Sequence, residues 1–128
     1  MRVLLDTHAF IWWDAAPQNL SVRAKAACFS PDTELMLSAA SVWEMQIKAM
    51  LGKLTLRNSL QEILSAQIRQ NGLVVLPIKL EHVFGLDSLP PHHKDPFDRM
   101  IVAQAISEGC AVISHDSAIT QYSVEVIW

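Results

Sequence analysis

The sequence predicts an α/β protein, a three-layer α/β/α sandwich around a central, mainly parallel sheet of about five strands. Two observations predict this fold. Short apolar runs such as RVLLD (residues 2–6) and ELMLS (34–38) look like strands buried on both faces, and amphipathic helical segments separate such runs along the chain. Strands that alternate with helices form right-handed βα units, which align the strands in parallel and cover both faces of the sheet.

The first strand, at 2–6, is expected to lead into a short helix at 8–14, which Pro17 closes. A second helix is expected at 19–29 from its composition. Its apolar face would consist of three side chains: Val22, Ala26 and Phe29.

The middle of the chain carries the clearest helical patterns. The strand at 34–38 precedes a helix at 39–51, whose apolar residues recur at helical spacing and which ends at Gly52. The next helix, at 60–71, has an apolar residue at every fourth position and stops at Gly72.

The third strand is expected at 73–78, and a short helix follows at 80–86. The segment 88–94 is a loop, because its two prolines forbid regular structure. Strands at 111–114 and 124–128 are expected to complete the sheet.

The segment HHKDPFDRM, residues 92–100, marks the start of the last long helix. Asp95 is a natural N-cap and Pro96 fits the first helical position. Asp98 falls in the first turn, where the helix dipole favours a carboxylate. The helix is expected to end before Gly109.

Residues 1–128 are expected to form one domain. The net charge of −3 argues against broad, sequence-independent adhesion to nucleic acid, which needs clustered Lys and Arg. Cys28 and Cys110 lie far apart without metal-finger spacing, so we expect reduced core thiols in a cytoplasmic protein. No apolar run approaches the ~18 residues of a membrane span, so no membrane partner is expected.

Four acids are expected at one edge of the sheet, after strand ends or early in helices: Asp6, Glu44, Asp98 and Asp116. Crowded carboxylates repel one another unless a cation neutralises them, and oxygen-only ligands suit Mg²⁺ or Mn²⁺. Such an ion can polarise a phosphodiester and lower the pKa of an attacking water. These positions therefore indicate metal-dependent phosphoryl transfer.

Structural explanations stay open for two of these acids. Asp98 can serve as a first-turn acid alone, and Glu44 can form a capping box with Ser41. Asp6 is harder to explain in this way, because an acid that ends a buried strand is costly to desolvate unless something binds it.

Four ordered motifs, LLDTHAFIWW, SAASVWEMQIKAMLGKL, HHKDPFDRMIVAQAISEG and VISHDSAIT, cover nearly the whole chain. In this order and at this spacing the chain resembles PIN-domain ribonucleases, and closely the VapC toxins of type II toxin–antitoxin pairs. The resemblance implies a Mg²⁺- or Mn²⁺-dependent endoribonuclease. Its catalytic and metal-holding quartet would be Asp6, Glu44, Asp98 and Asp116. Hydrolysis would use water activated by the metal, without a covalent enzyme intermediate.

The resemblance also implies partners: an RNA substrate, with tRNA and other structured RNAs as candidates, a VapB-type antitoxin that inhibits the enzyme, and a homodimer. The alternative is a catalytically silent PIN-like module that works through protein contacts. Retention of all four acids argues against that alternative.

Four further residues are expected to support the site or contact substrate: Thr7, Lys48, Arg99 and Ser114. Arg99 can contact phosphate or form an ion pair with a neighbouring acid, and we favour the ion pair. Lys48 is expected to neutralise Glu44 or to touch RNA. Ser114 stands where relatives often have threonine, and its hydroxyl can orient a carboxylate or water.

The histidines near the acids are not expected to be ligands. His92 and His93 follow two prolines and are expected to be solvated, with a contact to substrate as the alternative. His8 and His115 flank site acids and are expected to support them through hydrogen bonds.

Overall fold

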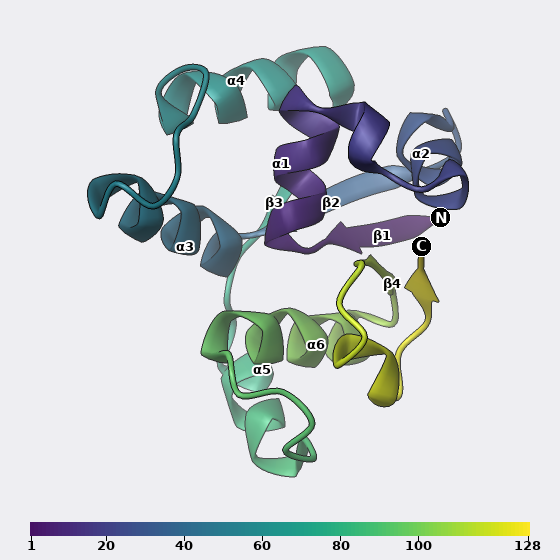
Figure 1. Ribbon diagram of the computed structural model, residues 1–128. Coiled ribbons are helices and arrows are strands. Elements are labelled where there is room, and N and C mark those ends of the chain that lie inside the picture. Colours follow the sequence, from purple (N-terminus) through teal and green to yellow (C-terminus); the bar gives the residue numbers. More distant parts are fainter.

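The computed structural model describes all 128 residues and confirms the predicted α/β architecture (Figure 1). Five strands form one sheet in the order β3-β2-β1-β4-β5, and every neighbouring pair is parallel. The strands are β1 (Arg2–Leu5), β2 (Glu34–Ser38), β3 (Val74–Leu76), β4 (Ala111–Ile113) and β5 (Val126–Ile127). Each lies within the range expected from the sequence.

The connections contain six α-helices: α1 (Thr7–Ala15), α2 (Val22–Phe29), α3 (Ala39–Met50), α4 (Leu60–Asn71), α5 (Leu80–Gly85) and α6 (Pro96–Glu108). Short 3₁₀ turns lie at Pro17–Asn19, Leu86–Ser88 and Ile119–Gln121. None of these helices combines the length and the apolar character that crossing a membrane requires.

Two hydrophobic cores cover the two faces of the sheet. Val3 and Leu5 belong to one core, which α1, α2 and α4 complete, whereas Leu4 belongs to the other, which α6 completes. Figure 1 shows α1, α2 and α4 on one side of the sheet and α5 and α6 on the other. Because neighbouring strand residues serve opposite cores, the strands appear in the sequence as continuous apolar runs.

The apolar face predicted for α2 is wrong. Ala24 and Cys28 are buried, whereas Val22 and Phe29 are exposed. The helix also begins at Val22 rather than at residue 19, because the Ser21 hydroxyl accepts the Ala24 N–H and caps it there. Both stripes have helical spacing, and the sheet takes the one with smaller side chains, which lets the helix approach closely. The larger apolar side chains are left on the surface.

Both ends of α6 match the prediction. Asp95 is the N-cap, and its Oδ1 accepts the N–H groups of Phe97 at 2.8 Å and Asp98 at 3.2 Å. At the other end Gly109 has a φ of +66°, the left-handed conformation that a side chain rarely adopts. The first turn of α6 is therefore held in place by the residues that precede Asp98.

The strand order creates a topological switch point between β1 and β4. The chain moves from β1 to β2 and β3 on one side, and then crosses to β4 and β5 on the other. The loops after β1 and β4 therefore leave in opposite directions and open a crevice at the carboxyl edge of the sheet. Asp6 and Ser114 are the first residues beyond these two strands.

Candidate active site

Asp6 lies at the bottom of the crevice and caps α1. Its Oδ1 accepts the Ala9 N–H at 2.8 Å, and the residue is 5% exposed. Burial raises the pKa of Asp6, although hydrogen bonds from Ser114 and Ala9 act in the opposite direction. The desolvation cost that we predicted for an acid at the end of a buried strand is thus seen as the raised pKa of Asp6.

Asp116 comes from the loop after β4, and its own turn holds it. Its N–H donates to Ser114 Oγ at 3.0 Å, and its Oδ1 accepts the Ala118 N–H at 2.9 Å. Burial works to raise the pKa of Asp116, but the hydrogen bonds from Ala118 and His93 outweigh it and lower the pKa below its ordinary value. Ser114 therefore orients two acids, as its hydroxyl suggested.

Asp98 lies in the first turn of α6 and faces the same crevice. Burial raises its pKa from 3.8 to about 7, and the negative charges of Asp95, Asp6 and Glu44 add to the rise, which His93 partly opposes. The first-turn position alone would favour the charged form. Burial, with the crowding of acids added to it, raises the pKa instead.

These three carboxylates meet in one hollow of about 330 Å³, which His8, Trp12 and His115 also line. The rings of His8 and His115 lie 6.0 Å and 6.4 Å from the Trp12 ring. The two histidines thus flank the acids, and they pack against an aromatic wall. No hydrogen bond joins either imidazole to a site acid, so the supporting bonds expected of them are absent.

Glu44 lies beside the hollow with both carboxylate oxygens already paired. The Thr7 hydroxyl donates to Oε1 at 2.6 Å, and the Lys48 ammonium lies 2.7 Å from Oε2. The capping box with Ser41 is absent, since Ser38 caps α3 and Ser41 contacts Thr7 instead. Glu44 is near enough to Asp98 to raise its pKa, yet it does not line the hollow.

Arg99 forms no ion pair with an acid, so that expectation is wrong. Its Nη1 donates to the Pro90 carbonyl at 3.0 Å and to the Tyr122 hydroxyl at 3.2 Å. Further contacts go to the carbonyls of Leu86, Leu89 and His93. The guanidinium holds the loop before α6, because several backbone carbonyls of that segment lie within its reach.

His93 enters the acidic site, contrary to the prediction that it is solvated. Its Nε2 lies 2.6 Å from Asp116 Oδ2 and 3.2 Å from Asp98 Oδ2. His92 stays exposed and only meets the edge of the Tyr122 ring. The sequence shows a histidine five positions before Asp98, but it holds no signal that tells which of the two neighbours turns inward.

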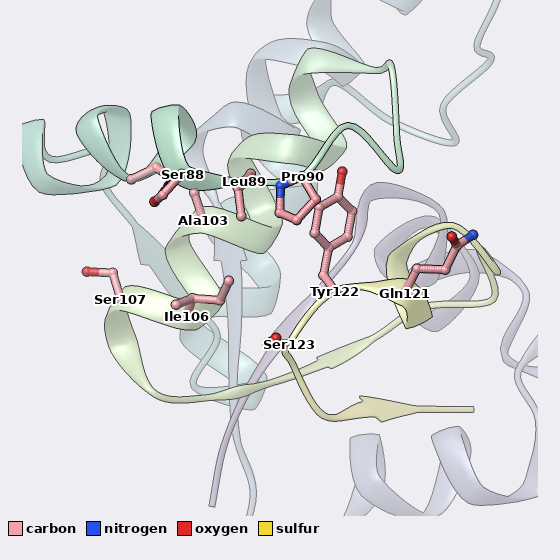
Figure 2. Close-up of a pocket in the computed structure, with 10 residues that line it drawn as sticks. Ser88, Leu89, Pro90, Ala103, Ile106, Ser107, Gln121, Tyr122 and Ser123 are labelled. Atoms are coloured by element: carbon pink, nitrogen blue, oxygen red, sulfur yellow. Dashed lines mark hydrogen bonds between the residues drawn. The ribbon is translucent and has the colours of Figure 1, made fainter.

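A second hollow, of about 450 Å³, lies on the outer side of α6 and has a different character. Figure 2 shows it between Ala103 and Ile106 of α6, the loop at Pro90, and Tyr122. Its lining contains no carboxylate, lysine, arginine or histidine. The smaller hollow is therefore the candidate for metal and phosphate chemistry.

Residues 3–125 match the family model of the PIN domain. The chain belongs to the PIN-domain family. The curated protein Ribonuclease VapC22 of Mycobacterium tuberculosis is 35% identical to this chain over 118 residues, which cover 89% of this chain and 86% of the relative.

Solved structures share the PIN fold at low sequence identity. VapBC2 from Rickettsia felis, bound to a DNA fragment from its promoter, aligns with a TM-score of 0.73 at 12% identity, covering 98% of this chain and 97% of the other. VapBC-1 from nontypeable Haemophilus influenzae aligns with a TM-score of 0.61 at 18% identity, covering 98% and 96%. Both confirm the fold of this PIN domain.

The acidic hollow fits the divalent cation that the family implies. Asp6, Asp98 and Asp116 offer carboxylate oxygens, the ligand type that Mg²⁺ and Mn²⁺ prefer. Their mutual repulsion helps to raise the pKa of Asp98 to about 7, and a cation among them would relieve it. Glu44 does not line the hollow, and Thr7 and Lys48 each engage one of its oxygens.

Proposed function

We propose that this PIN domain is a Mg²⁺- or Mn²⁺-dependent endoribonuclease that hydrolyses RNA phosphodiester bonds at the acidic hollow. The observation that carries the proposal is the meeting of three carboxylates from three separate elements at the switch point of the sheet. The 35% identity to Ribonuclease VapC22 supports the same activity. A bound ion of this class polarises the phosphodiester and lowers the pKa of water.

We assign the chain's own groups to separate tasks. Asp6, Asp98 and Asp116 would hold the ion, and Ser114 keeps two of these acids in their orientation. Glu44 would act through Lys48, whose ammonium it fixes at 2.7 Å beside the hollow. The half-exposed Lys48 is then placed to balance the charge of an RNA phosphate.

The test is cleavage of a panel of structured RNAs, tRNA included, by the purified protein with Mg²⁺, Mn²⁺ or EDTA. We expect cleavage with either metal and none in EDTA. Asp98→Asn and Asp6→Ala should each cleave at least about 100-fold more slowly, because each removes a carboxylate from the ion's donor set. Asp32→Asn is the matched control: this exposed acid precedes β2 at the opposite edge of the sheet and should leave the rate unchanged.

Cleavage that persists in EDTA, or in both variants, contradicts the metal-dependent mechanism. Absence of cleavage of any RNA by the wild-type protein supports the alternative, a PIN-like module that acts through protein contacts.

We also propose that the chain is the toxin of a toxin–antitoxin pair, acts in the cytoplasm as a homodimer and is inhibited by a VapB-type antitoxin. The names of the relatives support this, since one is a VapC ribonuclease and two are VapBC complexes. Large apolar side chains that a partner can cover are exposed on and just after α3 and on α5: Trp43, Met50, Leu51, Leu80 and Phe84. Expression of the chain alone should arrest growth, Asp98→Asn should not, and sedimentation should give the mass of a dimer.

A further inference from the structure

His93 occupies the position between two acids that a cation would also use. Its imidazole is mostly buried, with 16% of the side chain exposed, and its Nε2 meets Asp116 Oδ2 and Asp98 Oδ2 at 2.6 Å and 3.2 Å. One atom of each of these three side chains lies within 4.8 Å of the others. Distances alone would allow His93 to be a metal ligand, so the position of its proton decides its role.

The hydrogen bond on the other ring nitrogen decides that position. His93 Nδ1 lies 3.0 Å from the backbone nitrogen of Asp95, whose N–H can only donate. Nδ1 must therefore present its lone pair, and in the neutral imidazole the proton is on Nε2. An Nε2–H group has no lone pair for a metal. In this arrangement it donates to Asp116 Oδ2, and Asp98 Oδ2 lies 3.2 Å from the same nitrogen.

The backbone of His93 is anchored independently of the acids. Its N–H donates to the Tyr122 hydroxyl at 2.9 Å, and its carbonyl accepts from Arg99 at 3.4 Å. Arg99 and Tyr122 also bond each other, which ties the loop to α6 and to the turn after β4. The loop thus holds the imidazole over the acids.

We infer that His93 is a positioning residue that competes with the metal: its Nε2–H holds Asp98 and Asp116 together, and loading of the ion requires the imidazole to turn away. The inference rests on the proposed metal site and adds a control on its loading. The three carboxylate oxygen donors of the hollow are enough to bind an ion without the histidine. The structure therefore separates residues that bind the ion from one that opposes its entry.

The first test measures Mn²⁺ binding by calorimetry, without RNA. His93→Ala should bind Mn²⁺ about tenfold more tightly than the wild-type protein, the size expected when one competing hydrogen bond to a charged group is lost. His93→Gln keeps an N–H donor and should fall between the two. His92→Ala is the matched control and should bind as the wild type does, because His92 touches only the Tyr122 ring.

Equal or weaker binding by His93→Ala overturns the inference, and weaker binding would make His93 a ligand. Absence of Mn²⁺ binding to both the wild type and His93→Ala overturns the metal site itself and this inference with it. The two failures are therefore distinguishable.

A second test needs no substitution and so does not depend on how the variants fold. Nitrogen NMR of the wild-type imidazoles should show His93 in the Nε2–H form without metal. Addition of Mg²⁺ should shift the Nε2–H resonance of His93 as the bond to the acids is lost. An Nδ1–H form, or a resonance that Mg²⁺ saturation leaves unmoved, overturns the inference.

Discussion

Two histidines of this protein make the same pair of hydrogen bonds in opposite surroundings. His82 Nδ1 accepts the Lys79 N–H at 3.0 Å and its Nε2 lies 3.0 Å from Glu108, just as His93 accepts the Asp95 N–H and meets Asp116. In both residues Nδ1 faces an amide donor, so both imidazoles carry the proton on Nε2.

The two histidines differ in the charges around them. His82 is fully buried, and its partner Glu108 also bonds Arg2 at 3.3 Å and lies 4.0 Å from Lys79. The hydrogen bond from His82, with one from Arg2, lowers the pKa of Glu108. Arg2 and Lys79 offset the negative charge of Glu108, and the bond between His82 and Glu108 fastens α5 to α6.

The cluster around His93 has an excess of negative charge. Asp98 and Asp116 share one imidazole, Asp6 lies in the same hollow, and Arg99 makes no ion pair with them. The pKa of Asp98 rises to about 7, opposite in direction to that of Glu108 at the other end of α6. The same hydrogen-bond pattern thus gives a structural clamp where cations balance the acid's charge and a candidate ion site where they do not.

The largest effect on stability is expected at the clamp. His82→Ala should lower the free energy of unfolding by about 3 kcal/mol, because it opens a cavity at a fully buried side chain and leaves the Lys79 N–H without its acceptor. Urea denaturation measures the change, and Mn²⁺ affinity should stay at the wild-type value. A loss below about 1 kcal/mol would show that His82 is not a structural clamp between α5 and α6.

At the acidic hollow a substitution should raise the stability of the protein instead of lowering it. The pKa of Asp98 is raised from 3.8 to about 7, so its contribution to stability is full below about pH 4 and is lost as the pH rises through about 7. In EDTA, Asp98→Asn should therefore match the wild type near about pH 4 and be more stable by roughly 2 kcal/mol near about pH 8. Thermal unfolding across this range tests it. If Asp98→Asn is less stable than the wild type at about pH 8, the raised pKa of Asp98 is contradicted.

Glu108→Gln should give the smallest change in stability, and the change should depend on pH in the opposite way to that of Asp98→Asn. The pKa of Glu108 is lowered, so its contribution is present above the ordinary carboxylate pKa and is lost as the pH falls through the lowered value. The variant should be destabilised at neutral pH by no more than about 1 kcal/mol, because Arg2 and Lys79 are partly exposed. The difference from wild type should shrink in acid. Stabilisation at neutral pH would show that the charges at this cluster are not balanced.

Much of the site was predictable because the signals are local. Asp95, Pro96 and Asp98 mark the start of α6 within four residues, and the strand that Asp6 follows is apolar throughout. Parallel βα topology then brings three of the four predicted acids to one edge. Glu44 reaches the same neighbourhood. Its ion pair with Lys48 is an i,i+4 contact within α3, as the spacing predicted, whereas its bond with Thr7 depends on how α1 packs against α3.

By itself the sequence determined the succession of strands and helices along the chain, the caps of α6 and the places of three candidate site acids at the ends of these elements, because residues a few positions apart specify each of these. Only the tertiary structure decided that Ala24 and Cys28 are the buried stripe of α2, that Arg99 holds a loop, and that His93 rather than His92 reaches the acids. His93 and Asp116 are 23 positions apart, and Thr7 and Glu44 are 37 apart. Contacts of this kind depend on where separate elements meet in space, which spacing along the chain does not encode.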